Sequence, residues 1–335
     1  MIGVAFIGVG RMGLTHLRHL AAMPDVRVVV VADARREAAE QGKAIARAER
    51  ATDDIESAIT DPAVDAVLIA TPTATHAHLI EVAANAGKAI WCEKPIALEL
   101  GETQRIVALV NAKCVPLQIG FMRRFDPGYQ AAKRKIEAGE LGRIETFRAL
   151  SRDTYPPPLQ FLQGSGGIFL DMAVHDFDLA RYLVGEVEAV QAWGATLIDE
   201  RFREAGDADT AITLLRFANG ALGVVETARR SAWGYDIRTE VAGSDGKIVV
   251  EAVQKTPMTF SRRFGYEGDH FENFPDRFAA AYRLEIEAFF AALRAGLPPS
   301  PGPADALETQ RLALAATHSW REGRPVRVAE IQLTH

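Results

Sequence analysis

A glycine-rich turn near the start of the sequence restricts the fold of this chain more than any other feature. Three glycines in a G-x-G-x-x-G pattern follow the apolar run IGVAFI and precede an amphipathic stretch, LTHLRHLAAM. In a strand–turn–helix unit the first glycine permits a tight turn, the second lets the backbone approach a pyrophosphate, and the third lets helix and strand pack closely. The N–H groups that begin the helix also favour phosphate. The residues of this turn that we predict to bind a dinucleotide are Gly8, Gly10, Arg11, Met12 and Gly13.

The next strand-like run, VRVVVVAD, ends at Asp33, 20 residues after Gly13. A carboxylate at this spacing accepts hydrogen bonds from the adenosine ribose and repels a 2′-phosphate. Asp33 is therefore predicted to bind the cofactor and to favour NAD over NADP. Arg35 and Arg36 leave the use of both cofactors open, because an arginine here can pair with the extra phosphate.

Up to about residue 120, strand-like and helix-like segments alternate, which is typical of a doubly wound parallel sheet. Ligands of such sheets bind beyond the carboxyl ends of the strands. Thr71 and Pro72 follow one buried strand, and Glu93 and Lys94 end another, so we expect them to line the cofactor crevice. The Lys94 ammonium is either solvated or binds a substrate oxygen and stabilises its developing charge. His76, which begins the next helix, is counted with the crevice but interpreted as a cap or packing residue and not as a catalyst.

Charge and composition exclude several classes of partner. The formal net charge is −6 and the basic residues are spread along the chain, which argues against nucleic acid and anionic membrane surfaces. No apolar run approaches the roughly 20 residues that a membrane span needs, and no export signal is recognised. Cys92 and Cys114 belong to no metal-binding cluster. We therefore expect a cytoplasmic protein with a small-molecule partner and no metal.

Beyond about residue 120 the pattern changes, and no Gly/Ser-rich or Pro-rich linker marks the boundary. Between about 187 and 255 the sequence is strand-like, and it contains the dipeptides Asn219-Gly220 and Asp245-Gly246, which favour tight hairpin turns. This region therefore predicts an antiparallel sheet. Two further helices are expected at about 277–295 and 304–323.

The stretch GGIFLDMAVHDFDLARYLVG, from Gly166 to Gly185, is predicted to form a single helix between glycines. Asp171 and His175 are four residues apart and would lie on the same face of that helix. A carboxylate beside an imidazole makes a general base, because the acid orients the ring and favours its protonated form. Taken alone, the pattern favours a buried structural pair, since ion pairs that only hold helices together also perturb pKa values. A metal site is disfavoured, because no third ligand with suitable spacing is evident.

Five stretches in chain order, GVGRMG, ATPTATH, CEKP, GFMRRFDPGY and the Asp171–His175 segment, together resemble the Gfo/Idh/MocA family of NAD(P)-dependent oxidoreductases. The stretches GYDIRTEVAGSDG and DRFAAAYRLEIEAF extend the resemblance almost to the end of the sequence. The resemblance implies an α/β protein with an NAD-binding Rossmann domain over 1–120 and a substrate-binding domain over 121–335. The second domain would contain a large, mostly antiparallel open sheet, whose outer face would join the subunits of a dimer or tetramer.

The resemblance also changes the interpretation of the Asp171 and His175 pair to a catalytic one. It matches Lys94, Asp171 and His175 to the catalytic residues of the family. By looser local matches, the residues expected to face the substrate beside these three are Arg124, Asp153, Tyr235 and Tyr282.

The activity implied by the resemblance is NAD-dependent oxidation of a secondary hydroxyl of a cyclic polyol, with myo-inositol as the leading substrate. His175 would take the hydroxyl proton, Asp171 would hold the ring, and Lys94 would bind the oxygen. Alternatives within the enzyme class are scyllo-inositol, an inosose or a pyranose sugar. An alternative of another class is a non-catalytic sugar sensor, which the complete set of Lys94, Asp171 and His175 disfavours.

Overall fold

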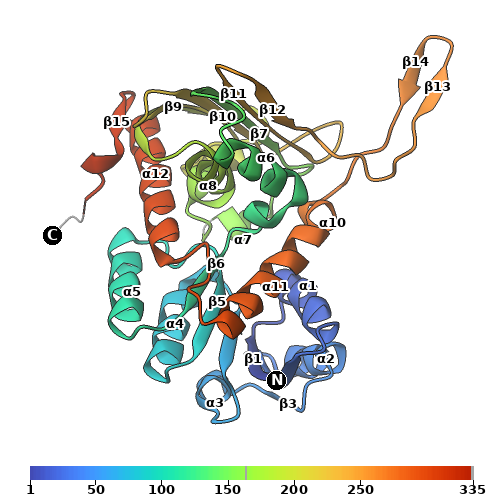
Figure 1. The fold of residues 1–335 in the computed structure, drawn as a ribbon, viewed down its shortest axis with the longest axis vertical. Coiled ribbons are helices and arrows are strands. Elements are labelled where there is room, and N and C mark those ends of the chain that lie inside the picture. Colours follow the sequence, from blue (N-terminus) through green and yellow to red (C-terminus); the bar gives the residue numbers. More distant parts are fainter. Residues whose placement is uncertain (163, 333–335) are drawn as a thin grey trace. The chain divides into compact units, whose positions relative to one another are not determined.

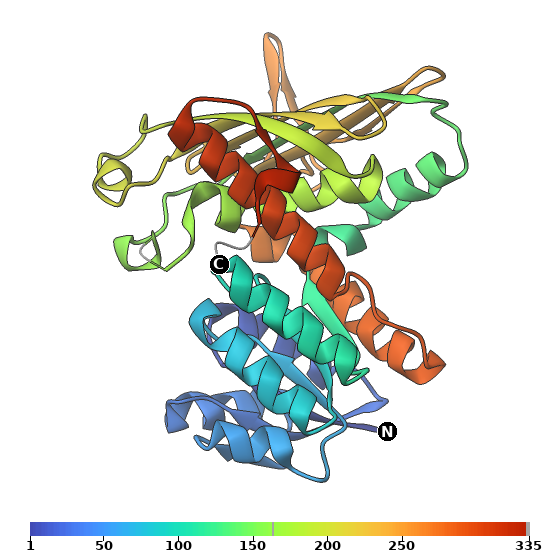
Figure 2. The ribbon, with the colours of Figure 1, turned by 90° about the vertical axis from the view of Figure 1, so that its left-hand side faces the viewer.

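The structure, a computed structural model, describes residues 1–162 and 164–332 and divides the chain into two compact units (Figures 1 and 2). The first unit comprises Met1–Met122 and Ala280–Glu308, and the second comprises Arg123–Ala279 and the chain from Thr309 onward. Residues 280–308, which lie within the predicted second domain 121–335, therefore group with the first unit. No helix among the described residues is long and apolar enough to cross a membrane.

The first unit contains a parallel sheet of six strands (Figure 1), as the alternating pattern predicts. Its strands, in sheet order, are β3 (Arg50–Thr52), β2 (Val26–Ala32), β1 (Ile2–Ile7), β4 (Ala66–Ile69), β5 (Ala89–Glu93) and β6 (Leu117–Gly120). At the end of β1, Ile7 pairs with Ala32 on one side and with Ile69 on the other. The carboxyl ends of the central strands therefore meet at one edge, as a doubly wound sheet requires.

The helices of this unit fill the connections between its strands, and α1 lies beside α2 and α4 beside α5. They are α1 (Arg11–Ala21), α2 (Arg36–Ala46), α3 (Ile55–Thr60), the 3₁₀ turn η1 (Thr73–Thr75), α4 (His76–Asn85), α5 (Leu100–Ala112) and, from the later part of the chain, α11 (Ala279–Ala295). Ile286, Phe289 and Phe290 of α11 are fully buried in the same core as Phe6 and Trp91. This apolar face explains why residues 280–308 belong to the first unit.

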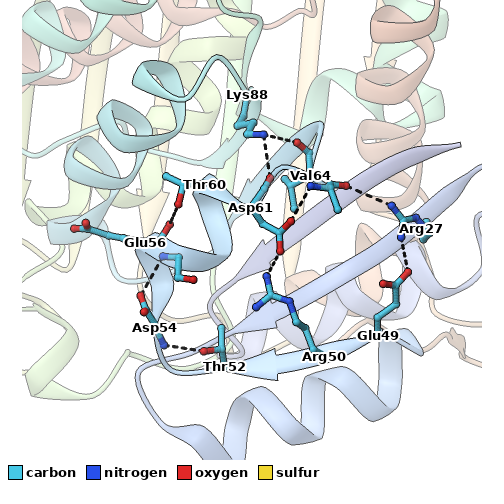
Figure 3. Close-up of polar contacts among 12 residues, drawn as sticks. Arg27, Glu49, Arg50, Thr52, Asp54, Glu56, Thr60, Asp61, Val64 and Lys88 are labelled. Atoms are coloured by element: carbon cyan, nitrogen blue, oxygen red, sulfur yellow. Dashed lines mark hydrogen bonds and ion pairs between the residues drawn. The ribbon is translucent and has the colours of Figure 1, made fainter.

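The amino-terminal edge of the same sheet is held by polar contacts (Figure 3). Arg27 pairs with Glu49 at 2.6 Å, and Arg50 pairs with Asp61. The Nζ atom of Lys88, just before β5, donates to the carbonyl oxygen of Asp61 at 3.1 Å. Exposed ion pairs of this kind contribute little stability singly. Their position at the amino ends of the strands separates them from the edge where ligands of such sheets bind.

The second unit is built on a mixed sheet of seven strands, in which the neighbours β7 and β10 are parallel and all other paired strands are antiparallel. This confirms the mostly antiparallel sheet. In sheet order the strands are β12 (Lys247–Val250), β11 (Asp236–Gly243), β7 (Ile144–Arg152), β10 (Leu222–Ala228), β9 (Thr210–Phe217), β8 (Val187–Ala195) and β15 (Val326–Arg327). The predicted turn dipeptides join β9 to β10 and β11 to β12.

Helices cover one face of this sheet (Figure 2), and the strands alternate accordingly. In β9, Leu215 is buried while Ile212 and Leu214 are exposed on the opposite face, as is Trp193 of β8.

The remaining elements are η2 (Met122–Phe125), α6 (Pro127–Glu137), α7 (Leu159–Leu162), η3 (Phe169–Ala173), α8 (Val174–Leu183), α9 (Arg201–Glu204), the hairpin β13 (Phe260–Arg262) and β14 (Gly265–Glu267), α10 (Phe274–Arg277), α12 (Pro303–Glu322) and η4 (Val328–Glu330). The β13–β14 hairpin projects from the second unit (Figure 1).

The helix predicted between Gly166–Gly167 and Gly185 is present, but its first part is not regular α-helix. Gly166 and Gly167 have positive φ angles of 79° and 86°, which glycine adopts readily. A π-helical turn, η3, follows, and regular α-helix begins only at Val174. The predicted apolar face is confirmed, because its four members are buried: Met172, Leu179, Ala180 and Leu183. Turns of π-helix occur frequently at functional sites, and Asp171 lies in this one.

Candidate active site

The glycine turn of the first unit has the geometry that a pyrophosphate requires. Gly8 has a φ angle of 96°, and a Cβ atom there would lie 2.6 Å from the carbonyl oxygen of Ala70. A Cβ atom on Gly13 would lie 2.0 Å from the carbonyl oxygen of Gly8, so helix and strand are in close contact. At Gly10, by contrast, a Cβ atom would meet nothing within 4 Å, and no side chain caps α1, among the residues that the structure describes. The open space and the uncapped helix start fit a dinucleotide.

Asp33 follows β2 and holds the same turn. Its Oδ2 atom accepts a hydrogen bond from the Val9 amide at 2.7 Å, and its Oδ1 atom accepts one from the Arg35 amide at 2.9 Å. The carboxylate is therefore fixed beside the glycine turn, where a ribose-binding group is expected. Arg36, the first residue of α2, lies 3.0 Å from Glu40 on the surface of that helix.

Two histidines connect the loops at the carboxyl edge of the sheet. The buried ring of His76 lies with Nδ1 2.8 Å from the carbonyl oxygen of Pro95 and Nε2 2.8 Å from that of Thr71. It thereby bridges the loops after β4 and β5, which agrees with a packing role. His16, which sequence reasoning missed, is fully buried on α1 with Nε2 2.9 Å from Glu93. In the sequence, His16 could be found only from its position beside Leu17, on the face of the predicted helix that is buried.

Two further predicted residues lie in the first unit. Lys94 directly follows β5 and is partly buried. Tyr282 lies on α11, is 4% exposed, and its ring contacts that of His16 edge-on at 5.5 Å between centroids. The other five predicted substrate or catalytic residues belong to the second unit: Arg124, Asp153, Asp171, His175 and Tyr235.

Arg124 is buried in the second unit and makes a two-point ion pair with Asp178 of α8. Its Nε and Nη2 atoms lie 2.8 Å and 2.6 Å from the two carboxylate oxygens. The guanidinium also lies over the ring of Tyr182, 4.9 Å from its centroid. These contacts fix the orientation of Arg124, because a bidentate pair constrains both position and plane.

Arg123, which sequence reasoning missed, organises a second buried cluster. Its Nη1 atom donates to Asp176 at 2.7 Å and to Ser151 at 3.0 Å, and the Ser151 hydroxyl donates to Asp176 at 2.7 Å. Burial lowers the pKa of Arg123 and the Asp176 charge raises it, with a net rise above its ordinary value. The cluster joins β7 to α8, the helix that carries His175.

Tyr235 lies against this cluster and is 7% exposed. Its ring meets that of Phe278 edge-on, with 6.3 Å between centroids. Burial raises the pKa of Tyr235 above its ordinary value, although the nearby Arg123 opposes the rise. The phenol therefore stays neutral and retains a hydroxyl that donates a hydrogen bond.

Asp153 and Asp171 come together around Arg229, a third residue that sequence reasoning missed. The Nη1 atom of Arg229 lies 2.7 Å from Oδ2 of Asp171 and 3.8 Å from Oδ2 of Asp153. His175, partly buried, lies in the first turn of α8, directly after the π-helical turn that carries Asp171. The second unit thus gathers two carboxylates, a guanidinium and an imidazole in neighbouring elements, a set that can bind hydroxyl groups and accept a proton.

Comparisons with known proteins agree with this arrangement. Residues 2–121 match the model of an oxidoreductase family with an NAD-binding Rossmann fold, and residues 129–249 match the GFO/IDH/MocA C-terminal domain. The chain is 39% identical over 330 residues to myo-inositol 2-dehydrogenase of Thermotoga maritima, covering 98% of this chain and 99% of that protein. It is also 39% identical to scyllo-inositol 2-dehydrogenase (NAD(+)) of Bacillus subtilis, covering 97% and 95%.

A solved structure of scyllo-inositol dehydrogenase from Lactobacillus casei, with bound NAD(H) and scyllo-inositol, superposes with a TM-score of 0.92. The two sequences are 28% identical, and the match covers 98% of this chain and 99% of that one.

Proposed function

Because the chain belongs to the Gfo/Idh/MocA family of NAD-binding oxidoreductases, we propose that it oxidises a secondary hydroxyl of a cyclic polyol, with myo-inositol as the leading substrate. The family, together with relatives named as inositol 2-dehydrogenases, indicates an NAD-dependent dehydrogenase. The observation that carries the substrate is the 39% identity, over nearly the full length of both chains, to an enzyme named for myo-inositol. The product of this oxidation is 2-keto-myo-inositol.

The first unit supplies the cofactor site. The open backbone at Gly10 and the start of α1 would hold the pyrophosphate, and Asp33 would accept hydrogen bonds from the ribose. His76 and the His16–Glu93 pair would keep the surrounding loops in place. When bound, NAD supplies the acceptor for the hydride that leaves the substrate carbon.

In the proposed mechanism His175 accepts the proton of the reacting hydroxyl. Asp171 orients the imidazole and stabilises its protonated form, and the Lys94 ammonium binds the same oxygen while its charge develops. Arg229 holds one oxygen of Asp171 in place at 2.7 Å. This assignment of His175, Asp171 and Lys94 rests on their match to the family motifs.

A neutral polyol needs many hydrogen-bonding groups and no charged side chain to pair with an ionised group. We assign this role to Asp153, Tyr235, Tyr282 and Arg124. The neutral phenol of Tyr235 suits the donation of a hydrogen bond to a hydroxyl oxygen. Arg124 would act from the fixed position that Asp178 gives it. Scyllo-inositol is the strongest alternative substrate, because a relative of equal identity is named for it.

We further propose that the protein works in the cytoplasm, as both cysteines are free. The exposed apolar face of the seven-stranded sheet, with Trp193, Ile212, Leu214 and Leu222, supports assembly into a dimer or tetramer.

The test is the rate of NAD reduction by purified protein with a panel of inositols and pyranose sugars, repeated with NADP. We expect the highest kcat/KM with myo-inositol and NAD. Turnover confined to scyllo-inositol or a sugar would move the substrate assignment and keep the mechanism. Tight NAD binding without turnover of any member of the panel would contradict the proposed activity and favour a sensor.

A further inference from the structure

We propose that Arg229 is a positioning residue of the reaction, which sets the proton affinity of His175 through its ion pair with Asp171. This inference rests on the proposed function, since it takes His175 as the base. It assigns a role to a buried charge that the family motifs do not include.

The sheet topology brings Arg229 and Asp153 together. Strands β7 and β10 are parallel neighbours, and their last residues, Arg152 and Ala228, are paired. Asp153 directly follows β7 and Arg229 directly follows β10. The Asp153 amide donates to the Ala228 carbonyl at 3.0 Å. Both side chains therefore leave the sheet at the same edge, and η3, which carries Asp171, lies against β10.

The charge of Arg229 is directed chiefly at Asp171. The side chain is 2% exposed, and its Nη1 atom donates to Asp171 at 2.7 Å. Its Nε and Nη2 atoms make no hydrogen bond within residues 1–162 and 164–332, so the one hydrogen bond of the guanidinium in that part of the chain is to Asp171. Asp153, at 3.8 Å, and Asp207 are the other carboxylates that act on it.

These carboxylates keep Arg229 charged. Burial alone lowers the pKa of Arg229, but the charges of Asp171, Asp153 and Asp207 raise it above its ordinary value. A buried guanidinium without them would be costly, because burying an unpaired charge is strongly unfavourable. Arg229 therefore stays charged while it is paired with Asp171.

The same cluster fixes the π-helical turn. Oδ1 of Asp207 accepts a hydrogen bond from the Ile168 amide at 3.0 Å, just before η3, while Arg229 holds Asp171 within it. The turn is thus anchored at its entry and in its middle. This anchoring places Asp171 relative to α8, whose second residue is His175.

The consequence for His175 follows from simple electrostatics. An ionised carboxylate raises the affinity of a neighbouring imidazole for a proton, and a base that is already protonated cannot accept the substrate proton. The guanidinium neutralises part of the Asp171 charge. Arg229 therefore weakens the effect of Asp171 on the proton affinity of the imidazole. The imidazole then stays neutral, and able to act as a base, at a lower pH than it would without the arginine.

The variant Arg229→Met tests the inference in the NAD-bound enzyme. We expect the acid limb of the plot of kcat/KM against pH to shift to higher pH by about one unit. On that limb kcat/KM should fall about tenfold, because one pH unit changes the neutral fraction of His175 tenfold. The affinity for NAD should not change. Arg229→Lys keeps the charge and should restore most of the wild-type profile. In an Asp171→Asn background, Arg229→Met should have little further effect.

Arg181→Met is the matched control. The side chain of Arg181 is also only 7% exposed, and its ion pair with Glu186 is at the other end of α8. Its loss should lower thermal stability comparably but leave the acid limb in place. An equal shift of the limb in Arg181→Met and Arg229→Met would overturn the inference, because it would reflect general damage to α8. Arg229→Gln replaces Arg229→Met if the methionine variant does not fold.

A readout that needs no substrate separates this inference from the proposed activity. The ring nitrogens of His175, identified in ¹⁵N NMR spectra by their loss in His175→Gln, are titrated in the wild type and in Arg229→Met. An upward shift of the titration midpoint supports the role of Arg229 even if no polyol is oxidised, and in that case only the proposed activity fails. An unchanged midpoint together with normal polyol turnover overturns the role of Arg229 and retains the activity.

Discussion

The carboxyl edge of the first sheet and the carboxyl ends of β7 and β10 in the second sheet are built in different ways. In the first unit the edge is made mainly of backbone, where glycines bring chain segments close together and Asp33 binds the turn beside it. In the second unit the corresponding edge of β7 and β10 is made of charged side chains, with Arg229 between Asp153 and Asp171. The first arrangement suits a ligand held by main-chain N–H groups, and the second suits proton transfer and hydroxyl binding. Under the proposed function, the backbone of the first unit would bind the cofactor and the side chains of the second unit would carry out the acid–base chemistry.

The largest expected effect comes from removing the proposed base. His175→Ala should lower kcat by about 10³-fold, because general-base catalysis contributes on that scale, while NAD binding, which belongs to the first unit, persists. Turnover and NAD affinity are measured by absorbance and by fluorescence titration. His78→Ala is the control, since His78 is exposed on α4 and pairs with Glu56. Turnover of His175→Ala at the wild-type rate would remove His175 as the base.

A smaller effect, on stability, should separate two glycines of the same turn. In Gly13→Ala the new methyl group would lie 2.0 Å from the Gly8 carbonyl oxygen, and overpacking of this kind costs about 1–3 kcal/mol of unfolding free energy. In Gly10→Ala the methyl group meets nothing within 4 Å, so stability should be unchanged while NAD binding weakens. Thermal unfolding and NAD titration of both variants test this. Equal losses of stability would mean that the space at Gly10 is not open.

The smallest effect is a pH dependence that arises in the first unit. Burial, with the neighbouring His16 and Arg283, lowers the pKa of His19 from 6.5 to about 4. Between these values the unfolded chain binds a proton that the folded protein does not. The free energy of unfolding should therefore decrease as the pH falls from 6.5 to about 4, by no more than about 1 kcal/mol, because His19 is partly exposed and solvent screens its charge.

Urea unfolding of the wild type and of His19→Gln at pH 7, 5.5 and 4 measures this contribution. The wild type should lose more stability than the variant over that range. His318→Gln is the control, because His318 is exposed on α12 beside Glu322. If His19→Gln and the wild type lose stability equally, the folded protein must accommodate a protonated His19.

The sequence predicts those features of the two units that depend on residues close together in the chain. The strand–turn–helix unit, the position of Asp33 and the hairpin at Asn219-Gly220 depend on residues close together in the chain, and the structure contains each of them. The pairing of Asp171 with Arg229 spans 58 residues and requires knowing that β7 and β10 are parallel neighbours. No local pattern contains that information.

Two other differences have the same origin. The π-helical turn at Phe169–Ala173 follows two glycines with positive φ angles and the Asp207 contact at Ile168, neither of which alters the periodicity of the apolar residues. The grouping of 280–308 with the first unit depends on which core receives Phe289 and Phe290, and an amphipathic pattern does not specify its partner. The catalytic roles of Lys94, Asp171 and His175 remain predictions from the family motifs.

The return of α11 to the first core affects how the protein can be synthesised and divided. A ribosome must add almost 290 residues before Phe289 and Phe290 are available to complete the core around a sheet whose last strand ends at Gly120. Until then the surface that these aromatic rings cover is open to water and to chaperones. A gene fragment that ends at residue 122 would therefore encode an unstable, aggregation-prone product, and exchange of nucleotide-binding modules between relatives would need to carry both segments together.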